Sequence, residues 1–468
     1  MGAMVRQENE QSVRVVEPLM TGLDPATVKQ TTVIVGMGMT GLSCARFLAA
    51  RGESLVIMDN RTAPPMETEV RRLLPPAAVL TGAYDEDLLC HCRQIIISPG
   101  VSQHTAQIAA ARKAGVPVFG DIELFARHAR APVIAITGSN GKSTVTALVT
   151  AMAQAAGRDV RTGANIGTPA LDLLGGPEPD FYILELSSFQ LETTTSLDAA
   201  AATLLNVSPD HMDRYTSEAD YLAAKLRVYQ GSGVIVVNRD AQMPGRHVTR
   251  GRRVTGFTLA RPADGDFGLL EHDGRDWLAH GEHVLMPVAD IALTGRHNIA
   301  NALAALALGD AVGLPEQAMC RALRDFKGLP HRMQRVAEHH GVRYYNDSKG
   351  TNVGATLAAL QGLDGKVVLI AGGLSKDGDF TPWRGPLADR GRAVVLIGRD
   401  AALIAAQLRG AVPVEYANDM AAAVQTASRL AQPGETVLLS PGCASFDMFS
   451  GYEQRGEAFI RAVTELGS

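Results

Sequence analysis

The chain has 468 residues, of which 46% are hydrophobic and 20% are charged, which is the composition of an ordinary globular protein with several domains. Its formal net charge of -5 gives no electrostatic reason to expect nucleic-acid binding. The sequence has no uninterrupted apolar run of the roughly 18 residues that a membrane-spanning helix needs, so we expect no membrane span.

The N-terminal segment and the cysteines indicate a cytoplasmic protein. Residues 1–28 are polar and mixed in charge, so we expect a flexible tail there rather than a signal peptide. The five cysteines are odd in number and lack the spacing of a disulfide framework, which is typical of reduced thiols. Cys90-His91-Cys92 looks like half of a metal site, but no second Cys/His pair lies nearby to complete it.

The first third of the chain alternates apolar strand candidates with helix candidates. Strands are predicted at Thr31–Val35, Ser54–Met58 and Gln94–Ile97, and a helix is predicted at Gly41–Arg51. This alternation predicts βαβ units around a parallel sheet.

The alternation restarts at Pro132–Ile136, which runs directly into a Gly-rich turn. Further strands are predicted at Phe181–Leu184, Ala202–Leu205 and Val234–Val237, and a helix at Ala300–Leu308. Residues 240–290 contain many Gly, His and Asp residues between short alternating stretches, which predicts a small antiparallel appendage.

A third restart comes near residue 330. Buried strands are predicted at Val367–Ile370, Val394–Ile397 and Val437–Leu439, with a helix at Asp400–Leu408. We therefore predict an α/β protein of three domains, over residues 29–127, 128–328 and 329–468. The first and third are expected to be Rossmann-like, and the central one to carry a parallel sheet plus the appendage.

The first chemical motif is Gly36-Met37-Gly38-Met39-Thr40-Gly41, which follows a strand and opens a helix. Asp59 stands at the end of the next strand, which completes the pattern of a dinucleotide-binding turn. The residues alone therefore favour a bound dinucleotide or another phosphate-bearing ligand at a helix N-terminus. The alternative is that the glycines only pack the helix against the strand.

The second motif, Thr137–Thr144 (TGSNGKST), is a shortened P-loop, since Ile136 stands where a strict motif has its first glycine. Backbone N–H groups around Gly141 can cradle phosphates, Lys142 can reach the terminal ones, and Ser143 can bind Mg²⁺. A surface turn is the alternative, but the strand before it and the helix after it favour nucleotide binding.

Two acidic clusters follow the P-loop. Glu185 ends a predicted strand, where a second Mg²⁺ contact is expected beside a P-loop, although it could simply cap a helix. His211 lies in Asn206–Tyr215 (NVSPDHMDRY), which alone reads as a surface loop but beside a phosphate site becomes a candidate metal or phosphate contact.

The last third has polar loops at predicted strand ends, where α/β sheets bind ligands. These are Pro330–Arg332 (PHR), Asn346–Asn352 (NDSKGTN), Gly372–Phe380 (GGLSKDGDF) and Ser440–Phe449 (SPGCASFDMF). Each loop is weak by itself, but together they predict a site that faces the P-loop domain.

Taken in order, these motifs resemble those of the Mur ligases, the ATP-dependent amide-forming enzymes of peptidoglycan synthesis. The resemblance covers nearly the whole chain from about residue 31. TGSNGKST, LELSSFQLE, NVSPDHMDRY, GRHNIANALAA, NDSKGTN and SPGCASFDMF are closest to the member that adds D-glutamate to UDP-N-acetylmuramoyl-L-alanine. The resemblance implies three domains that bind the UDP-linked substrate, ATP and the amino acid, in that order, with the third also completing the ATP site.

The resemblance changes the meaning of the first motif, because this family binds a UDP group there and not NAD. It implies UDP-substrate contacts from Met39, Thr40, Asp59, Arg61, Gly100 and Asn165. It implies ATP contacts from Ser139, Asn140, Gly141, Lys142, Ser143, Thr144, Asn298, Asn301, Arg332 and Asp347. Lys142, Glu185, His211 and Lys225 would be catalytic, with Mg²⁺ held by Ser143, Glu185, His211 and a carbamylated Lys225. A carbamate offers the anionic oxygens that a hard cation prefers, whereas an ammonium would repel it.

For D-glutamate the resemblance implies Lys349, Thr351, Lys376, Ser445, Phe446 and Tyr452. Two positions depart from the family pattern: Tyr452 stands where Phe is common, and Leu374-Ser375 stands where Asp-Gly is common. These departures bear on the fine geometry of the amino-acid pocket.

The reaction expected from the resemblance proceeds through an acyl phosphate, with closure of the third domain to exclude water. We expect a cytoplasmic monomer. The alternatives are a family member that adds another amino acid or L-glutamate, a nucleotide-binding regulator without catalysis, and an NAD-dependent oxidoreductase.

Overall fold

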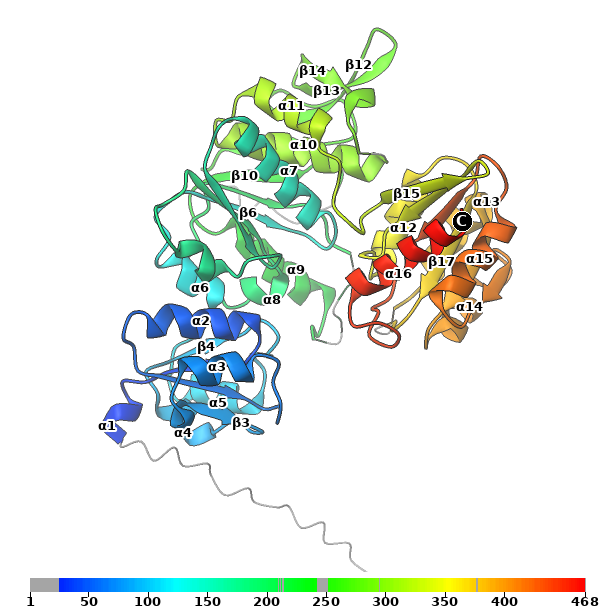
Figure 1. The fold of residues 1–468 in the computed structure, drawn as a ribbon. Helices are drawn as coiled ribbons and strands as arrows, with labels where there is room; N and C mark the ends of the chain where they lie inside the picture. The colour runs from blue at the N-terminus through cyan, green and yellow to red at the C-terminus, as the bar shows by residue number, and fades with distance from the viewer. Residues whose placement is uncertain are drawn as a thin grey trace, which may run out of the picture. The chain divides into compact units, whose positions relative to one another are not determined.

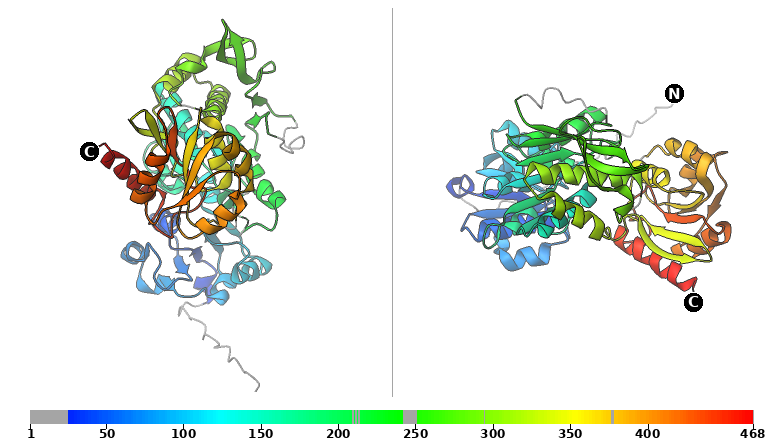
Figure 2. Two further views of the ribbon diagram at one scale, coloured as in Figure 1. Left: turned by 90° about the vertical axis from the view of Figure 1, so that its right-hand side faces the viewer. Right: turned by 90° about the horizontal axis from the view of Figure 1, so that it is seen from above.

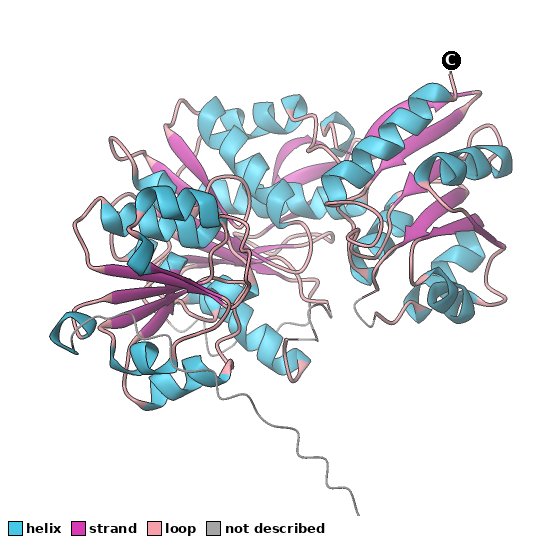
Figure 3. Ribbon diagram, turned by 60° about the horizontal axis from the view of Figure 1, so that its bottom comes forward, coloured by secondary structure: helices cyan, strands magenta, loops and turns pink. Residues whose placement is uncertain are grey.

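The computed structural model describes residues 25–467 except 209, 211, 213, 242–250, 294, 376 and 377. The chain divides into two compact units, Met1–Asp121 and Ile122–Ser468. Three sheets with helices packed on them make up the fold, so the predicted α/β class with three domains is confirmed (Figure 3). Within the described residues, no helix has the length and hydrophobicity needed to cross a membrane.

The first unit, blue to cyan in Figure 1, is built on a five-stranded parallel sheet in the order β3-β2-β1-β4-β5. The strands are β1 Thr32–Val35, β2 Leu55–Asp59, β3 Val79–Thr81, β4 Gln94–Ile97 and β5 Val118–Gly120. The helices are α1 Pro25–Val28, α2 Met39–Ala49, α3 Glu67–Leu73, α4 Glu86–His91 and α5 Ala106–Lys113. Alternate residues of β1, such as Val33 and Val35, pack against α4 and α5. The strand order reverses between β1 and β4, which is where sheets of this kind bind ligands.

The central part of the second unit is a nine-stranded sheet in the order β14-β13-β12-β11-β10-β9-β6-β8-β7. Its strands are β6 Val133–Thr137, β7 Val160–Ala164, β8 Phe181–Glu185, β9 Ala201–Leu204, β10 Val234–Asn238, β11 Val254–Phe257, β12 Phe267–His272, β13 Arg275–His280 and β14 His283–Pro287. Its longer helices are α7 Lys142–Ala155, α9 Glu218–Leu226, α10 Arg296–Ala311 and α11 Glu316–Asp325, with α6 Asp121–Ala126 and α8 Ser188–Leu191 as short ones. The buried faces of α7, α10 and α11 form one core with this sheet.

The predicted antiparallel appendage is present as β12, β13 and β14. It begins later than residue 240, because β11 pairs in parallel with β10 and so extends the main sheet. Residues 242–250 of the predicted range lie outside the described residues.

The last sheet has six strands in the order β15-β16-β20-β17-β18-β19, and only its edge strand β15 is antiparallel to its neighbour. Its strands are β15 Gln334–His339, β16 Val342–Asn346, β17 Val367–Gly372, β18 Gly391–Ile397, β19 Val414–Tyr416 and β20 Thr436–Leu439. Its helices are α12 Val353–Gly362, α13 Arg384–Arg390, α14 Ala401–Leu408, α15 Met420–Leu430 and α16 Tyr452–Glu465. One face packs against α12, α13 and α14, and the other against α15 and α16, with α16 shown in red in Figure 2.

Candidate active site

The loop between β6 and α7 has the backbone of a phosphate-binding turn. Gly138 and Gly141 adopt φ angles of 158° and 84°, which side chains disfavour, and Gly141 caps α7. A Cβ atom at Gly141 would lie 2.5 Å from the Asn301 Oδ1 atom, so α10 packs directly against the loop. Because Gly141 lacks a side chain, the loop can turn tightly in front of the free N–H groups that open α7, which is the backbone geometry of an anion-binding turn.

Two lysines converge on one carbonyl oxygen of this loop. Lys142 Nζ donates to Gly138 O and Ser139 O, both at 2.9 Å, and Lys225 Nζ donates to the same Gly138 O at 2.9 Å. Burial lowers the pKa of Lys142. Burial and the nearby positive charge of Lys142 lower the pKa of Lys225 well below its usual range. Two ammonium groups beside one oxygen repel each other, so the charge of Lys142 adds to burial in favouring the neutral form of Lys225.

Beside the lysines, a chain of hydrogen bonds runs through Ser143 and Glu185. Ser143 Oγ donates to Glu185 Oε2 at 2.5 Å, and Asn165 Nδ2 donates to Glu185 Oε1 at 2.7 Å. Arg332 lies just before β15 of the C-terminal sheet, and its Nη2 atom donates to Ser143 Oγ at 2.6 Å. Glu185 ends β8, as predicted from the sequence, and its side chain is buried. A buried carboxylate beside a hydroxyl is the type of ligand set that Mg²⁺ prefers.

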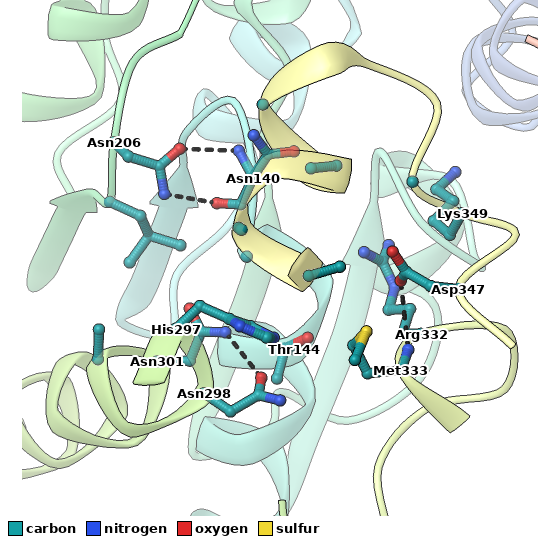
Figure 4. Close-up of a pocket in the computed structure, with 18 of the residues that line it drawn as sticks. Asn140, Thr144, Asn206, His297, Asn298, Asn301, Arg332, Met333, Asp347 and Lys349 are labelled. Atoms are coloured by element: carbon teal, nitrogen blue, oxygen red, sulfur yellow. Dashed lines mark hydrogen bonds between the residues drawn. The ribbon is translucent and has the colours of Figure 1, made fainter. Parts of the chain in front are cut away.

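A cavity of about 380 Å³ adjoins the P-loop and has α10 and α12 in its walls. We call it the α10–α12 pocket. Seven of the predicted ATP contacts line it: Asn140, Gly141, Thr144, Asn298, Asn301, Arg332 and Asp347. Figure 4 shows His297, Asn298, Asn301 and Thr144 on one side and Arg332, Met333, Asp347 and Lys349 on the other. The other predicted ATP contacts, Ser139, Lys142 and Ser143, lie in the loop and the first turn of α7 beside it.

Asp347 is a buried residue in the wall of the α10–α12 pocket. Ser440 Oγ donates to Asp347 Oδ2 at 2.7 Å, and the Met333 backbone N–H donates to Asp347 Oδ1 at 3.2 Å. Burial raises the pKa of Asp347 to about 6, although these hydrogen bonds oppose the rise. The carboxylate is therefore ionised at neutral pH and can accept a hydrogen bond from a polar ligand.

Lys349 also lines the α10–α12 pocket, although the family resemblance implies that it contacts the amino acid rather than ATP. Its Nζ atom lies 3.8 Å from the centre of the Tyr452 ring, which is the distance of a cation–π contact. Burial, together with the positive charge of Arg332, lowers the pKa of Lys349 to about 8. The structure thus brings two of the predicted amino-acid residues together, next to the predicted nucleotide contacts.

The loops that carry the other predicted amino-acid residues are joined by backbone hydrogen bonds. Leu374 and Ala444 exchange N–H···O bonds of 2.9 Å in both directions, so the loop after β17 lies against the loop after β20. Ser445 is buried, whereas Phe446 is 72% exposed. Thr351 follows Lys349 and donates its backbone N–H to the Lys349 carbonyl at 2.8 Å. Lys376 lies outside the described residues.

In the first unit, two of the predicted UDP-substrate residues, Asp59 and Arg61, lie together beside the turn after β1. Asp59 is buried and accepts hydrogen bonds from the Met37 N–H at 2.7 Å and from Arg61 Nε and Nη2 at 2.8 and 2.7 Å. Burial raises the pKa of Asp59, but these hydrogen bonds outweigh it and lower that pKa below its usual value. A Cβ atom at Gly41 would lie 1.9 Å from Gly36 O, so this turn requires glycine.

The remaining UDP-substrate residues are exposed or lie elsewhere. Met39 is 52% exposed in the first turn of α2, beside Thr40, and Gly100 is exposed in the loop after β4. Asn165 belongs to the second unit, where its amide donates to Glu185. Its predicted role toward the UDP substrate stays a prediction.

The predicted Mg²⁺ ligands are only partly in contact with one another, and the metal site stays a prediction. Ser143 and Glu185 are in contact and Lys225 shares Gly138 O with Lys142, whereas His211 lies outside the described residues. Within the described part of the chain, no three His, Cys, Asp or Glu side chains gather to hold a metal ion. A site formed by these residues would therefore need further oxygen ligands from a nucleotide, water or a carbamate.

Several residues around the site escaped prediction. Asn206 Oδ1 accepts from the Asn140 N–H at 2.9 Å, and Asn206 Nδ2 donates to Asn140 O at 3.0 Å, so it holds the P-loop in shape. Arg455, buried in α16, donates to Ser348 O at 2.8 Å and to Cys443 O at 3.1 Å, which joins two of the predicted loops. Asn206 is the first residue of the NVSPDHMDRY motif, so the sequence could have identified it. Arg455 lies inside a helix without any such motif, so the sequence gives no sign of its role.

Known families match the chain along most of its length. The family models that match are the N-terminal domain of Mur ligase MurD-like proteins at residues 30–120, the Mur ligase middle domain at 136–309, and the Mur ligase glutamate ligase domain at 331–443. Curated relatives named UDP-N-acetylmuramoylalanine--D-glutamate ligase are similar to it. The one from Nitrosococcus oceani is 54% identical over 441 residues, covering 94% of this chain and 97% of the relative. The one from Pseudomonas aeruginosa is 50% identical over 438 residues, covering 93% and 98%.

Solved structures share the fold at low sequence identity. UDP-N-acetylmuramate-alanine ligase MurC from Thermotoga maritima has a TM-score of 0.60 and 16% identity, covering 93% of this chain and 99% of its own. MurF ligase from the same organism, solved in complex with ADP, has a TM-score of 0.59 and 15% identity, covering 95% and 97%. FolC from E. coli has a TM-score of 0.57 and 18% identity, covering 74% and 93%.

Proposed function

Because the chain belongs to the Mur ligase family, we infer that it joins D-glutamate to UDP-N-acetylmuramoyl-L-alanine and converts ATP to ADP and phosphate. Relatives that are 50% to 54% identical over nearly the whole chain are named for this reaction. The observation that carries the inference is the α10–α12 pocket, where a P-loop faces Arg332, Asp347 and Lys349. An amide ligase needs this combination, since the nucleotide and the amino acid must meet at one carboxylate.

The proposed reaction has two steps. An oxygen of the alanyl carboxylate attacks the γ-phosphorus of ATP, the bond to the β-phosphate oxygen breaks, and ADP leaves. The amine of D-glutamate then attacks the carbonyl carbon of the acyl phosphate, loses a proton, and inorganic phosphate leaves as the amide forms. Phosphorylation is needed because a free carboxylate is a poor electrophile.

Lys142 and Arg332 are proposed to offset the negative charge that gathers during phosphoryl transfer. Lys142 Nζ donates to the Gly138 and Ser139 carbonyl oxygens of the P-loop, and Arg332 Nη2 donates to Ser143 Oγ, which supports this role. The carbonyl oxygens that Lys142 contacts here would be exchanged for phosphate oxygens when the nucleotide binds. The P-loop N–H groups would orient the same phosphates.

We propose that Ser143, Glu185, His211 and a carbamylated Lys225 hold Mg²⁺ with the phosphates of ATP. When bound, the ion supplies positive charge to the phosphate oxygens. The contact between Ser143 and Glu185 supports the site, because both offer oxygen atoms within reach of one cation. His211 stays a prediction.

The environment of Lys225 supports its carbamylation. The unprotonated amine is the form that attacks CO₂, and burial beside Lys142 favours that form. The nitrogen lone pair forms a bond to the carbon of CO₂, and one N–H proton is lost to solvent, which leaves a carbamate anion. The anion would relieve the repulsion between the two lysines and add oxygen ligands.

For the other two substrates, the proposed contacts follow the predictions from the sequence. D-Glutamate would contact Lys349, Thr351, Lys376, Ser445, Phe446 and Tyr452, and the UDP group would contact Met39, Thr40, Asp59, Arg61, Gly100 and Asn165. Arg61 and the Met37 N–H already donate hydrogen bonds to both oxygens of Asp59, so this carboxylate also holds Arg61 and the turn after β1 in place. We further propose a cytoplasmic monomer, as expected from the sequence.

The test is phosphate release from ATP with UDP-N-acetylmuramoyl-L-alanine and a panel of amino acids that includes both glutamate enantiomers. We expect release only when D-glutamate is present, with one amide formed for each phosphate released. Equal release with L-glutamate, or release that depends on another amino acid, would assign the chain to a different reaction within the family. An absorbance change with NAD(P)H would point to the oxidoreductase alternative.

A further inference from the structure

The N-terminus of α12 contacts the P-loop through one side chain, Asn352. Its Oδ1 atom accepts a hydrogen bond from the Ala355 N–H at 2.8 Å, which caps the helix. Because the cap requires the oxygen, the Nδ2 group must point the other way. It donates to Asn140 Oδ1 at 3.3 Å and to Asp210 Oδ2 at 3.2 Å.

The two acceptors belong to segments that are themselves bound together. Ser139 Oγ donates to Ser208 O and accepts from the Ser208 N–H, both at 3.0 Å. Asn140 is paired with Asn206 through two hydrogen bonds, as described above. The P-loop and the segment after β9 therefore form one surface, and Asn352 bonds to both parts of it.

The backbone of α12 also approaches this surface closely. A Cβ atom at Gly354 would lie 3.0 Å from Ser208 Oγ and 3.4 Å from Asn140 Nδ2, so there is little room for a side chain at this contact. Residues Gly354, Ala355, Ala358 and Ala359 of α12 line the α10–α12 pocket, whereas Asn352 does not. Asn352 thus fixes one wall of the pocket without occupying the pocket itself.

Asn352 differs in this respect from Arg332, a second side chain of the C-terminal part that bonds to the P-loop region. Arg332 bonds to Ser143, whose hydroxyl is proposed to bind the metal and the phosphates, so that bond would be exchanged on nucleotide binding. Asn352 bonds to the Asn140 amide oxygen and to the Asp210 carboxylate, neither of which is proposed to bind the metal. Because Asp210 does not line the pocket, at least the bond to Asp210 can persist while the pocket is filled.

We propose that Asn352 is a positioning residue that latches α12 onto the P-loop and so couples the nucleotide pocket to the amino-acid loop. Asn352 directly follows Thr351, which together with Lys349 is proposed to contact D-glutamate. The latch therefore also sets where these two residues lie relative to the P-loop. This inference rests on the proposed function. Without the latch, the two halves of the pocket spend less time together, and every ligand that needs both binds more weakly.

The experiment compares Asn352→Ser with Asn352→Ala. Serine caps a helix almost as well as asparagine but is too short to reach Asn140 and Asp210, whereas alanine loses both the cap and the latch. Asp419→Ser is the matched control. Asp419 caps α15 through the Ala422 N–H at 2.8 Å in the same way, on the opposite face of the sheet from α12.

We expect both Asn352 variants to bind ADP about tenfold more weakly by calorimetry, as for the loss of a hydrogen bond to a charged group. The KM for D-glutamate should rise by a similar factor in both. The ratio of phosphate released to amide formed should also rise, because an acyl phosphate in a loosened pocket is exposed to water. The Asp419→Ser variant should match the wild type in all three measurements.

Wild-type behaviour of Asn352→Ser would overturn the proposal, because it would reduce Asn352 to a helix cap. Equal losses in Asn352→Ser and Asp419→Ser would also overturn it, by showing a general effect of replacing a cap. Measurements on the wild-type chain distinguish a failure of the latch proposal from a failure of the proposed function. If it binds ADP but shows no release dependent on D-glutamate, the proposed function fails, while the ADP comparison still decides the latch.

Discussion

The turn after β1 and the loop after β6 share a layout, but the charges around them differ. Each follows a buried parallel strand, contains glycine at positive φ (Gly36 in the first, Gly138 and Gly141 in the second), and opens a helix. The turn after β1 has one buried acid, Asp59, which is bonded to Arg61 and the turn itself. The loop after β6 is flanked by Lys142, which is partly buried, and by Lys225 and Glu185, which are buried.

This difference teaches that the strand–turn–helix geometry provides a place for phosphate, while the buried charges decide whether chemistry follows. At the first turn the one carboxylate is neutralised within its own unit, so the site is suited to holding a ligand. At the second, like charges are held close together in a desolvated place, which is how sites that react are built. The predictions below separate binding from reaction at the two turns.

The largest effect is expected at Lys142. Lys142→Ala should reduce kcat by at least about 10²-fold to 10³-fold, because it removes a preorganised charge from the phosphoryl group as it transfers. The measurement is phosphate release in the presence of D-glutamate and the UDP substrate, with Lys113→Ala on the exposed end of α5 as the control. Near-normal release from the Lys142 variant would contradict the assignment of the reaction to this loop.

The second effect is expected at Lys225. Lys225→Ala should lower kcat by about 10²-fold, since the carbamate oxygens would be lost. Acetate or formate should restore part of the rate, because a small carboxylate can enter the space that the carbamate leaves. Wild-type enzyme stripped of CO₂ should lose activity and regain it with bicarbonate, and the alanine variant should not respond. Full activity of Lys225→Ala, with a plain amine in electron density of the wild type, would refute carbamylation.

The sequence predicts those parts of this picture that depend on short segments. Gln94–Ile97 is predicted with its observed bounds because three isoleucines follow one another on a strand that is buried on both faces. The strand β15, with the sequence QRVAEH, escapes prediction because it lies half exposed at the sheet edge and lacks an apolar run. The boundaries at residues 128 and 329 stay predictions.

In the candidate site, too, some residues could be predicted from short segments of sequence and some contacts could not. The P-loop and Glu185 are found from the sequence because each has a strand directly before it. The meeting of Lys142 and Lys225 at one carbonyl oxygen could not be predicted, because the two residues lie in different helices and only the packing of α9 joins them. The bond from Asn352 to Asp210 likewise joins residues that are 142 positions apart in sequence.

A third prediction addresses the turn after β1. Asp59→Ala should raise the KM for UDP-N-acetylmuramoyl-L-alanine by tens of fold, since the turn and Arg61 lose hydrogen bonds to a charged group that are worth about 1.5 to 3 kcal/mol each. The KM for ATP and the kcat at saturating substrate should change little, because no reacting group is removed. A large fall in kcat with an unchanged KM would mean that the first turn takes part in the chemistry, and the contrast between the two turns would fail.

The smallest effect is expected from pH at Lys349. Its pKa of about 8 leaves the side chain charged below pH 8 and neutral above it. If the ammonium holds an anionic group of the amino acid, binding should weaken as pH rises through 8. Lys349→Arg keeps its charge over this range, so its KM for D-glutamate should not show that dependence.

The substrate amine also titrates in this range, and its deprotonation accelerates the attack on the acyl phosphate in both proteins. The ratio of kcat/KM between wild type and Lys349→Arg cancels that contribution and leaves the titration of Lys349. We expect the ratio to fall by about tenfold between pH 7 and pH 9, because the charged fraction of a group of pKa 8 changes by about that factor. A ratio that stays flat would show that the charge of Lys349 is not used, and that the cation–π contact with Tyr452 serves only the packing of the two loops.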